Sequence, residues 1–226
     1  MEDFFSAQKD LEKKKILITA GPTYEKIDPV RFIGNYSSGK MGFALAEACA
    51  ERGAEVTLVA GPVSLKTHHP AIKRIDVESA GEMYQAAMTA FPSSDAAILC
   101  AAVADYRPEN ASEQKIKRET EREMTLHLVP NPDIAASLGA IKREGQVMVG
   151  FALETNDEAT HAEGKLKRKN LDFIVLNSLR DQGAGFRCDT NKITIIDNAG
   201  GVTSYPLKTK REVACDIVNK LVILLK

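Results

Sequence analysis

Short apolar segments rich in Ile, Val and Leu recur along the chain and alternate with longer amphipathic segments. The apolar segments lie at residues 15–20, 55–60, 72–77, 95–101, 147–152 and 172–177. Segments of this length with apolar residues at consecutive positions are typical of strands that are buried on both faces. Their alternation with helix-length segments predicts βαβ units, and hence an α/β domain with a doubly wound, Rossmann-like parallel sheet.

Helix signals lie between these segments. Apolar residues at positions 41, 45, 48 and 49 share one face of a predicted helix that ends near Arg52. Gly53 follows, and glycine readily adopts the left-handed conformation that closes a helix. Ser79 has Glu82 three residues after it, which is the spacing of a capping box and predicts the start of a second helix.

The later part of the chain predicts further helices and a hairpin. Asn131-Pro132-Asp133 matches the cap, the first position and the acidic first turn of a helix. Another helix is expected from residue 155 or 156 to about residue 170, and a final one from Thr209 to the end. Short strands at residues 192–197 and 202–205 flank the turn sequence NAGG, which predicts a C-terminal antiparallel hairpin.

Length and composition suit one globular domain. The chain has 226 residues, of which 44% are hydrophobic and 27% charged, and these shares exclude disordered and fibrous classes. We assign the polar residues 1–14 to a lead-in or linker and residues 15–226 to a single domain. The formal net charge is −1, without the basic balance of a nucleic-acid binder, so we expect no nucleic-acid partner.

Cysteine usage and the amino-terminal sequence indicate a cytoplasmic protein. The four cysteines lie far apart and form no CxxC pair, so neither a zinc site nor a disulfide framework is indicated. No apolar stretch approaches the ~18 residues of a membrane span, and the apolar start is too short for a signal peptide. We therefore expect no membrane partner.

The active site is expected in two long loops. In a doubly wound sheet, ligands bind beyond the carboxyl ends of the strands, next to the point where the strand order reverses. The loops after the first and fourth predicted strands, residues 21–40 and 102–118, flank this point, and both are polar and charged. Structureless connections longer than about 12–15 residues are usually functional, so the loop lengths themselves indicate a site.

The sequence GNYSSGK at residues 34–40 fits the spacing of a phosphate-binding P-loop. Met41 follows where that motif needs Ser or Thr to hold magnesium, and no strand is predicted immediately before it, so we do not interpret it as a P-loop. Two interpretations of Ser37, Ser38 and Gly39 stay open. They lie at a helix start and either receive an anion there or simply cap the helix.

Charged residues in and near these loops are further candidates. Asp105 follows a predicted strand closely enough to reach a nucleotide or its magnesium, although it can also be an ordinary loop residue. The basic sequence KIKR at residues 115–118 can neutralise charge on a phosphate or remain a solvated run. Lys165 and Lys169 share a helix face, and the helix dipole alone explains lysines near a helix end.

At these same positions the chain resembles the phosphopantothenate–cysteine ligase (phosphopantothenoylcysteine synthetase) family of coenzyme A biosynthesis. The matching sequences are LITAGPTYEKIDPVRFIGNYSSGKMGFALAEA from Leu17, VTLVAGPVSL from Val56, AAVADYRP from Ala101, KIKR from Lys115, NPDI from Asn131, VGFALET from Val149 and KLKRKNLDFIVLN from Lys165. They cover nearly the whole domain in the family's order. In bacteria this domain often forms the carboxyl-terminal half of a bifunctional protein.

The resemblance implies a reaction and its partners. A nucleoside triphosphate, CTP in bacterial members, would activate the carboxylate of 4′-phosphopantothenate as an acyl-cytidylate with loss of pyrophosphate. Cysteine would then displace CMP to form the amide. Mg²⁺ would accompany the triphosphate without dedicated tight protein ligands. A homodimer is implied, with the C-terminal hairpin region as a contributor, and so is a fused or associated flavin-dependent decarboxylase.

The resemblance also implies residue roles. Lys115 would be the catalytic cation, and Asn35 would hold the carbonyl or acyl phosphate of the intermediate, with Arg31 and Ala102 beside it in the pantothenate site. The implied nucleotide site consists of Asp105, Lys115, Asn131, Pro132, Asp133, Ile134, Phe151, Lys165 and Lys169. The sequence departs from the family pattern at Arg118, where Lys is usual, at Gly34, where Ser is common, and at Leu153, where Ala is common.

Two other functions are weighed against the ligase. A Rossmann oxidoreductase dependent on NAD(P) would need a tight GxGxxG turn after its first strand, where this chain has GPTYEKIDPVR. A nucleotide-binding protein without catalysis would leave the KIKR loop dispensable. The residues alone do not favour CTP over ATP, because that preference comes only from the bacterial relatives.

Overall fold

The computed structural model describes residues 9–117, 123–154, 164–178 and 188–226. Within these ranges the chain forms an eight-stranded sheet with the order β13-β12-β10-β9-β6-β1-β4-β5. The parallel strands are β1 (Lys15–Ala20), β4 (Glu55–Ala60), β5 (Ile72–Asp76), β6 (Ala96–Leu99), β9 (Val147–Glu154) and β10 (Phe173–Ser178). The doubly wound parallel sheet predicted from the apolar segments is confirmed.

The strand order reverses between β1 and β6. From β1 the sheet grows through β4 to β5 on one side and through β6 and β9 to β10 on the other. Parallel pairing sets Leu17 beside both Thr57 and Ala97. The carboxyl ends of β1 and β6 therefore lie next to each other, where the first and fourth predicted strands were expected to flank the site.

The far edge of the sheet is antiparallel. Strand β12 (Ile193–Asp197) pairs with β10, and β13 (Val202–Ser204) pairs with β12. Gly200 turns the chain between them with a φ of +87°, a value that favours glycine. The predicted C-terminal hairpin is confirmed. A short pair, β11 (Thr190–Asn191) with β14 (Lys208–Thr209), lies beside it in the sequence.

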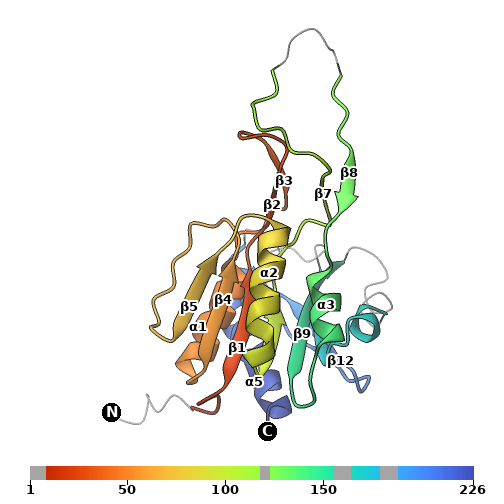
Figure 1. Cartoon of the computed structure of the whole chain (residues 1–226). Helices are drawn as coiled ribbons and strands as arrows, with labels where there is room; N and C mark the ends of the chain where they lie inside the picture. The colour runs from red at the N-terminus through yellow and green to blue at the C-terminus, as the bar shows by residue number, and fades with distance from the viewer. Residues whose placement is uncertain (1–8, 118–122, 155–163, 179–187) are drawn as a thin grey trace.

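Helices cover both faces of the sheet (Figure 1). On one face α1 (Lys40–Glu51) packs against α5 (Lys210–Leu224) in a core with the buried side chains of β1 and β4. On the other face α2 (Ala80–Ala90), the 3₁₀ turn η1 (Phe91–Ser93) and α3 (Ile134–Ala140) form a second core. Both layers exclude water from the strands, which is why the apolar segments are continuous.

The helix ends agree with most of the sequence signals. Gly53 has a φ of +94° after α1, and α2 begins with the capping box of Ser79 and Glu82. Thr209 and Glu212 form another capping box at the start of α5. The predicted start of α3 is wrong. Asp133, and not Asn131, is the cap, because its side chain accepts the Ala136 N–H, so the helix begins at Ile134.

The helix predicted from residue 155 or 156 to about residue 170 is described only in part. Residues 155–163 lie outside the described ranges, and residues 164–168 are helical. The described turn ends at Asn170, whose φ of +51° takes the chain out of the helix. Arg118 of the KIKR sequence also lies outside the described ranges.

The two long loops contain strands that sequence analysis missed. In the first, β2 (Tyr24–Lys26) and β3 (Phe32–Gly34) form an antiparallel hairpin, so a strand does precede the GNYSSGK sequence. In the second, β7 (Tyr106–Pro108) pairs with β8 (Leu128–Pro130). We call these four strands, with the turn at residues 27–31 and the residues 109–117 and 123–127 between β7 and β8, the arm. The arm projects from the sheet at the end opposite the C-terminus (Figure 1).

The packed domain includes residues that sequence analysis assigned to the lead-in. Leu11 is fully buried, and its N–H donates to the Arg52 carbonyl at 3.1 Å. The Arg52 guanidinium pairs with the Asp10 carboxylate, and this hydrogen bond lowers the pKa of Asp10 below its ordinary value. Leu11 is thus part of the core, and Asp10 is attached to the residue that follows α1.

Candidate functional site

The loops that follow β1 and β6 are bound to each other directly beyond the strand ends. Pro22 and Ala102 form an isolated parallel bridge, and the Ala102 N–H donates to the Gly21 carbonyl at 2.9 Å. The buried Thr23 hydroxyl accepts the Ala104 N–H at 2.9 Å. The parallel pairing of β1 and β6 therefore continues past the sheet and brings the two predicted loops together.

Asn35 adds a side-chain contact between the same loops. Its Nδ2 donates to the carbonyl oxygens of Ala102 at 3.0 Å and Val103 at 3.2 Å. Asn35 directly follows β3, so this contact also ties the arm to the loop after β6. Asn35 and Ala102, which sequence analysis placed in one subsite, are in contact.

A cavity of about 760 Å³ lies at this junction, a size that suits a nucleotide or a drug-sized ligand. The residues of the expected site that line it are Asn35, Ala102, Asp105, Asn131, Pro132, Asp133, Ile134, Phe151, Lys165 and Lys169. They come from the loop after β3, the β6–β7 loop, the start of α3, the middle of β9 and the segment of residues 165–169. Sequence analysis expected these segments to converge, and the fold brings them together.

One wall of the cavity is the start of α1. Gly39 occupies the cap position with a φ of +76°, and α1 has no side-chain capping hydrogen bond. Ser37 Oγ accepts the Gly39 N–H at 3.3 Å, before the helix begins. Gly39 therefore occupies the cap position, and the two serines precede it. Gly42 lies so close to β1 that an added Cβ would be 2.5 Å from the Ala20 Cβ, which holds the helix start against the strand end.

Asn131 and Asp133 hold the opposite wall. Asn131 Nδ2 donates to the Ala104 carbonyl at 2.9 Å, and its backbone N–H donates to the Asp105 carbonyl at 2.8 Å. Asp133 caps α3 and forms an ion pair of 2.9 Å with Lys169. Burial alone would raise the pKa of Asp133, but hydrogen bonds from the Ala136 amide and Lys169 lower it below its ordinary value. The side chains of both residues thus fix the cavity wall.

The cavity continues to the α1/α5 face of the sheet, where Phe151 packs against the core. Polar side chains on this face that the expected site did not include are Lys40, Asn177, Asn191 and Lys210. Lys210 is only 7% exposed, its Nζ donates to the Cys188 carbonyl, and burial lowers its pKa. Asn177 could have been found from its place at the end of a predicted strand. No sequence signal links Asn191 or Lys210 to the loops after β1 and β6.

Cys100 also lines this cavity, directly after β6. The sequence predicts a strand over residues 95–101, but β6 ends at Leu99. Cys100 therefore lies just beyond the strand and is partly exposed to the cavity. Burial raises the pKa of its thiol to about 12, so at neutral pH it is a thiol and a poor nucleophile.

Arg31 and Lys115 do not line the cavity. Both lie on the arm, where Arg31 follows the turn between β2 and β3 and Lys115 lies in the connection between β7 and β8. They are neighbours all the same, because Arg31 Nη2 donates to the carbonyl of Ile116, the residue after Lys115, at 2.6 Å. The arm, which sequence analysis missed, separates these two residues from the other ten.

The charge pattern of the cavity suits an anionic ligand with a cation of its own. Lys40, Lys165, Lys169 and Lys210 line it, against the carboxylates of Asp105 and Asp133. Asp105 is exposed, whereas Asp133 is bound to Lys169. Among the described residues, no three His, Cys, Asp or Glu side chains gather as metal ligands would. A Mg²⁺ ion needs only one or two carboxylates when phosphate oxygens supply its other ligands, so Asp105 fits that pattern.

A sequence profile matches almost the whole of this domain. The profile describes the DNA/pantothenate metabolism flavoprotein C-terminal domain and covers residues 11–224. The chain belongs to this family. The match begins at Leu11, the buried residue ahead of β1, and ends with α5. The family resemblance drawn from the motifs is confirmed.

Two relatives with high sequence identity carry different names. A protein from an unknown prokaryotic organism, named cysteine/cysteine sulfinic acid decarboxylase, is 57% identical over 225 residues, 98% of this chain and 62% of its own length. The coenzyme A biosynthesis bifunctional protein CoaBC of Vibrio parahaemolyticus serotype O3:K6 (strain RIMD 2210633) is 50% identical over 221 residues, 97% of this chain and 55% of its own length. The chain therefore spans little more than half the length of these relatives.

A solved structure supports the same assignment. The crystal structure of the C-terminal domain of a coenzyme A biosynthesis bifunctional protein CoaBC superimposes with a TM-score of 0.81 and 40% identity, covering 96% of this chain and 98% of that one. The family fold thus includes the doubly wound sheet and its antiparallel edge. Within the described ranges of this family member, no helix is long and apolar enough to cross a membrane.

Proposed function

We propose that this chain joins 4′-phosphopantothenate to cysteine in coenzyme A biosynthesis, with CTP as the activating co-substrate. The observation that carries the proposal is the hydrogen-bonded junction of the β1 and β6 loops beside one cavity lined by cations. The family match and the relatives named CoaBC support it. Ligand binding at such a junction is the rule for doubly wound sheets.

The proposed reaction has two steps. A carboxylate oxygen of 4′-phosphopantothenate attacks the α-phosphorus of CTP, the bond from that phosphorus to the bridging oxygen breaks, and pyrophosphate leaves. The amine nitrogen of cysteine then attacks the acyl carbon, the carbon–oxygen bond to the phosphate breaks, and CMP leaves while the amine loses a proton. The nucleotide thus converts a poorly electrophilic carboxylate into a mixed anhydride with a good leaving group.

Residues of the cavity are assigned to the two substrates. We assign Asn131, Pro132, Asp133 and Ile134 at the start of α3, with Phe151, Lys165 and Lys169, to the nucleotide, and Ala102 to the pantothenate subsite. Both hydrogens of the Asn35 amide face loop carbonyls, so its Oδ1 is left to accept a hydrogen bond. The amide N–H of 4′-phosphopantothenate is a suitable donor, which differs from the carbonyl contact expected from the family.

Mg²⁺ and the arm complete the proposal. Mg²⁺ would offset the charge of the triphosphate, and Asp105 is the exposed cavity carboxylate that can reach it. Lys115 would stabilise the negative charge that develops on the transferring groups. Because Lys115 lies on the arm outside the cavity lining, its role requires the arm to approach the bound substrates.

The rival oxidoreductase is disfavoured by the first loop. After β1 the chain enters the Pro22 bridge and the β2–β3 hairpin, whereas a dinucleotide-binding fold continues from a tight glycine turn directly into a helix. Here α1 begins only at Lys40, 20 residues after β1 ends at Ala20.

The experiment that tests the function supplies 4′-phosphopantothenate, cysteine and Mg²⁺ with CTP, ATP, GTP or UTP in turn. We expect pyrophosphate release with CTP that requires 4′-phosphopantothenate, and amide formation only when cysteine is also present. Carbon dioxide from cysteine or cysteine sulfinate is measured in parallel, because one relative carries a decarboxylase name. Pyrophosphate release that is independent of 4′-phosphopantothenate, or decarboxylation without amide formation, would refute the proposal.

We also propose a homodimer and a decarboxylase partner. Large apolar side chains are exposed on β3, β7, β8 and the β2–β3 turn, among them Val30, Phe32, Tyr106 and Leu128, and such patches usually mark protein contacts. The arm of a second copy is the proposed occupant. The relatives named as bifunctional are nearly twice as long as this chain, so we propose that a flavin-dependent decarboxylase acts fused to it or beside it.

A further inference from the structure

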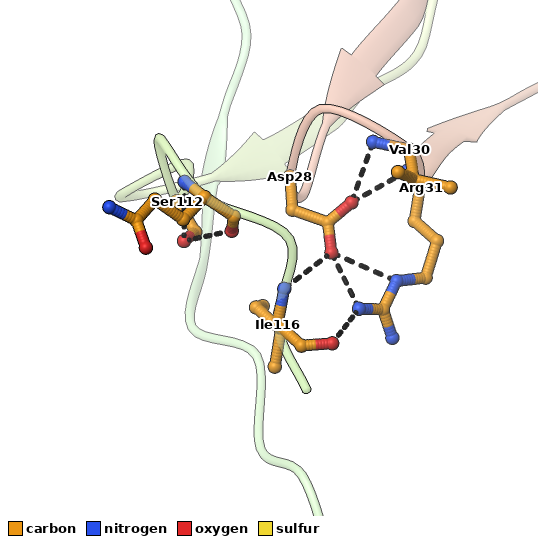
Figure 2. A network of polar contacts seen from close by, with 6 residues as sticks. Asp28, Val30, Arg31, Ser112 and Ile116 are labelled. Carbon is orange, nitrogen blue, oxygen red and sulfur yellow. Dashed lines mark hydrogen bonds and ion pairs between the residues drawn. The ribbon is translucent and has the colours of Figure 1, made fainter. Parts of the chain in front are cut away.

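Asp28 is a buried carboxylate at the turn between β2 and β3. It is 1% exposed. Its Oδ1 accepts the N–H groups of Val30 and Arg31, both at 2.8 Å. Its Oδ2 accepts Nε of Arg31 at 2.9 Å, Nη2 of Arg31 at 2.6 Å and the N–H of Ile116 at 3.1 Å (Figure 2). Every donor but one comes from the turn itself, and the exception lies 88 residues later in the chain.

Ile116 is held on both sides by this network. Its N–H donates to Asp28, and its carbonyl accepts Arg31 Nη2 at 2.6 Å (Figure 2). The N–H belongs to the planar peptide group that joins Lys115 to Ile116, and the carbonyl belongs to the next peptide group. The two peptide groups on either side of the Ile116 Cα are therefore held, and the first of them includes the Cα and the carbonyl of Lys115.

A charged Asp28 is what makes the contact strong. Burial alone would raise the pKa of Asp28, but hydrogen bonds from the Val30 amide, the Arg31 side chain and the Arg31 and Ile116 amides hold it well below its ordinary value. Hydrogen bonds to an ionised acceptor are about twice as strong as those between neutral groups. The ionised form therefore persists at neutral pH.

The same hairpin reaches the cavity through its other end. Strand β3 leads from Arg31 to Asn35, whose side chain binds the loop after β6 at the cavity edge. The Ser112 N–H donates to the Ile27 carbonyl at 2.9 Å, which adds a second attachment of the Lys115 segment to the hairpin. One short hairpin thus contacts both the cavity edge and the backbone of the lysine loop.

We propose that Asp28 is a positioning residue, which, together with Arg31, clamps the Ile116 backbone and so sets Lys115 for its role in the ligase reaction. This inference rests on the proposed function. It also revises the role of Arg31, because two of its three guanidinium nitrogens are committed to the clamp rather than to substrate. A residue that served only to hold the fold would not act through Lys115 in particular.

The first test measures how firmly the Ile116 backbone is held, and it does not depend on enzyme activity. Trypsin cleaves after lysine, and the Lys115–Ile116 bond is the peptide group whose N–H is bound to Asp28. We expect trypsin to cleave this bond in folded Asp28→Asn about tenfold faster or more than in the native protein. The rate of cleavage depends on local opening of the loop, and the variant lacks the strong hydrogen bonds that oppose this opening. Arg31→Lys keeps the positive charge but removes the paired Nε and Nη2 donors, and it should increase the cleavage rate less.

Ser112→Ala is the matched control for proteolysis. Its hydroxyl bonds only Gln114 within the same loop, so cleavage at Lys115 should stay at the native rate. Mass spectrometry identifies the cleaved bond, and circular dichroism establishes that each variant is folded. If Asp28→Asn fails to fold, Arg31→Lys carries the test. Cleavage within about twofold of the native rate in both folded variants would overturn the clamp.

The second test asks whether Asp28 acts through Lys115. We expect Asp28→Asn to lower kcat for pyrophosphate release about tenfold or more, with the dissociation constant for CTP within about twofold of the native value. In a Lys115→Ala background, Asp28→Asn should then have no further effect. An equal loss in both backgrounds would overturn the positioning role. If the native protein itself released no pyrophosphate, the proposed function would fail, and the trypsin result would still decide the clamp.

Discussion

Single side chains carry the chemistry of this site, and Lys115 is the one whose removal should be most informative. We expect Lys115→Ala to lower turnover roughly 10²-fold or more, because it removes a cation from charge that develops during acyl transfer. CTP binding should change much less. Lys73→Ala, an exposed lysine on the edge strand β5, is the matched control and should leave turnover unchanged.

Steady-state kinetics and isothermal titration with CTP separate these effects. Near-normal turnover by Lys115→Ala would favour a nucleotide-binding protein in which the lysine loop is dispensable. If CTP affinity fell by the same factor as turnover, Lys115 would contribute to CTP binding rather than to catalysis.

Asp28 predicts a particular pH dependence of stability. Its folded pKa is lowered, so its ionised form stabilises the fold above its ordinary pKa of about 4. This contribution is lost as the pH falls below that value toward the folded pKa. The difference in melting temperature between the native protein and Asp28→Asn should therefore be largest near about pH 6 and shrink toward about pH 3. A constant difference over this range would show that the carboxylate charge is not what stabilises the turn.

Site residues could be predicted from the sequence only where they lie in a recognisable motif or directly after a predicted strand. Asn35 and Asp105 follow recognisable segments, and both line the cavity. Lys210 was missed because it is the first residue of the last helix, and only the tertiary fold carries it to the end of β10. Asp28 was missed because a turn aspartate has no signature that distinguishes a buried clamp from a solvated residue.

At the scale of elements, the start of α3 links helix capping to the cavity. Asp133 accepts the Ala136 N–H at 3.0 Å and pairs with Lys169 at 2.9 Å. We expect Asp133→Ala to lower the free energy of unfolding by about 0.5–2 kcal/mol, the usual value of a helix cap. Asp133→Asn keeps a capping oxygen, and the partly exposed ion pair contributes little, so most of the stability should remain.

Urea unfolding of the two variants measures the difference. An equal loss in Asp133→Ala and Asp133→Asn would assign the stabilisation to the ion pair with Lys169 instead of to the cap. We expect the free energy of unfolding of Asp133→Asn to be close to the native value and that of Asp133→Ala to be lower. This order would also support a helix that begins at Ile134, and not at the earlier position predicted from the sequence.

Elements of the sheet could be predicted because each is an apolar segment buried on both faces. Strands β1 and β4 have the predicted limits, and the other parallel strands differ at their ends by up to two residues. The strands of the arm could not be predicted. Each is three residues long, β3, β7 and β8 are largely exposed, and β7 pairs with β8 about 20 residues away. Such pairing leaves no hydrophobic period in the sequence.

For the whole molecule, the exposed apolar surface of the arm predicts where two copies meet. Leu128→Glu on β8 places a charge in the proposed contact and should shift the protein from dimer to monomer. Val202→Glu tests the C-terminal hairpin, whose exposed strand β13 was the contact expected from the family resemblance. We expect Val202→Glu to remain dimeric.

Sedimentation velocity over a range of concentrations distinguishes these outcomes. Dissociation by Val202→Glu but not by Leu128→Glu would move the contact from the arm to the hairpin. A native protein that is monomeric at all concentrations would remove the homodimer from the account.

The central claim is that the junction of the two loops activates a carboxylate by joining it to a nucleotide phosphate. The most direct test uses 4′-phosphopantothenate labelled with oxygen-18 in its carboxylate, in a complete reaction with CTP, Mg²⁺ and cysteine. An acyl-cytidylate intermediate predicts that the CMP formed carries one labelled oxygen, because the carboxylate oxygen leaves with the phosphate. Unlabelled CMP, or label recovered in inorganic phosphate together with CDP, would contradict the account.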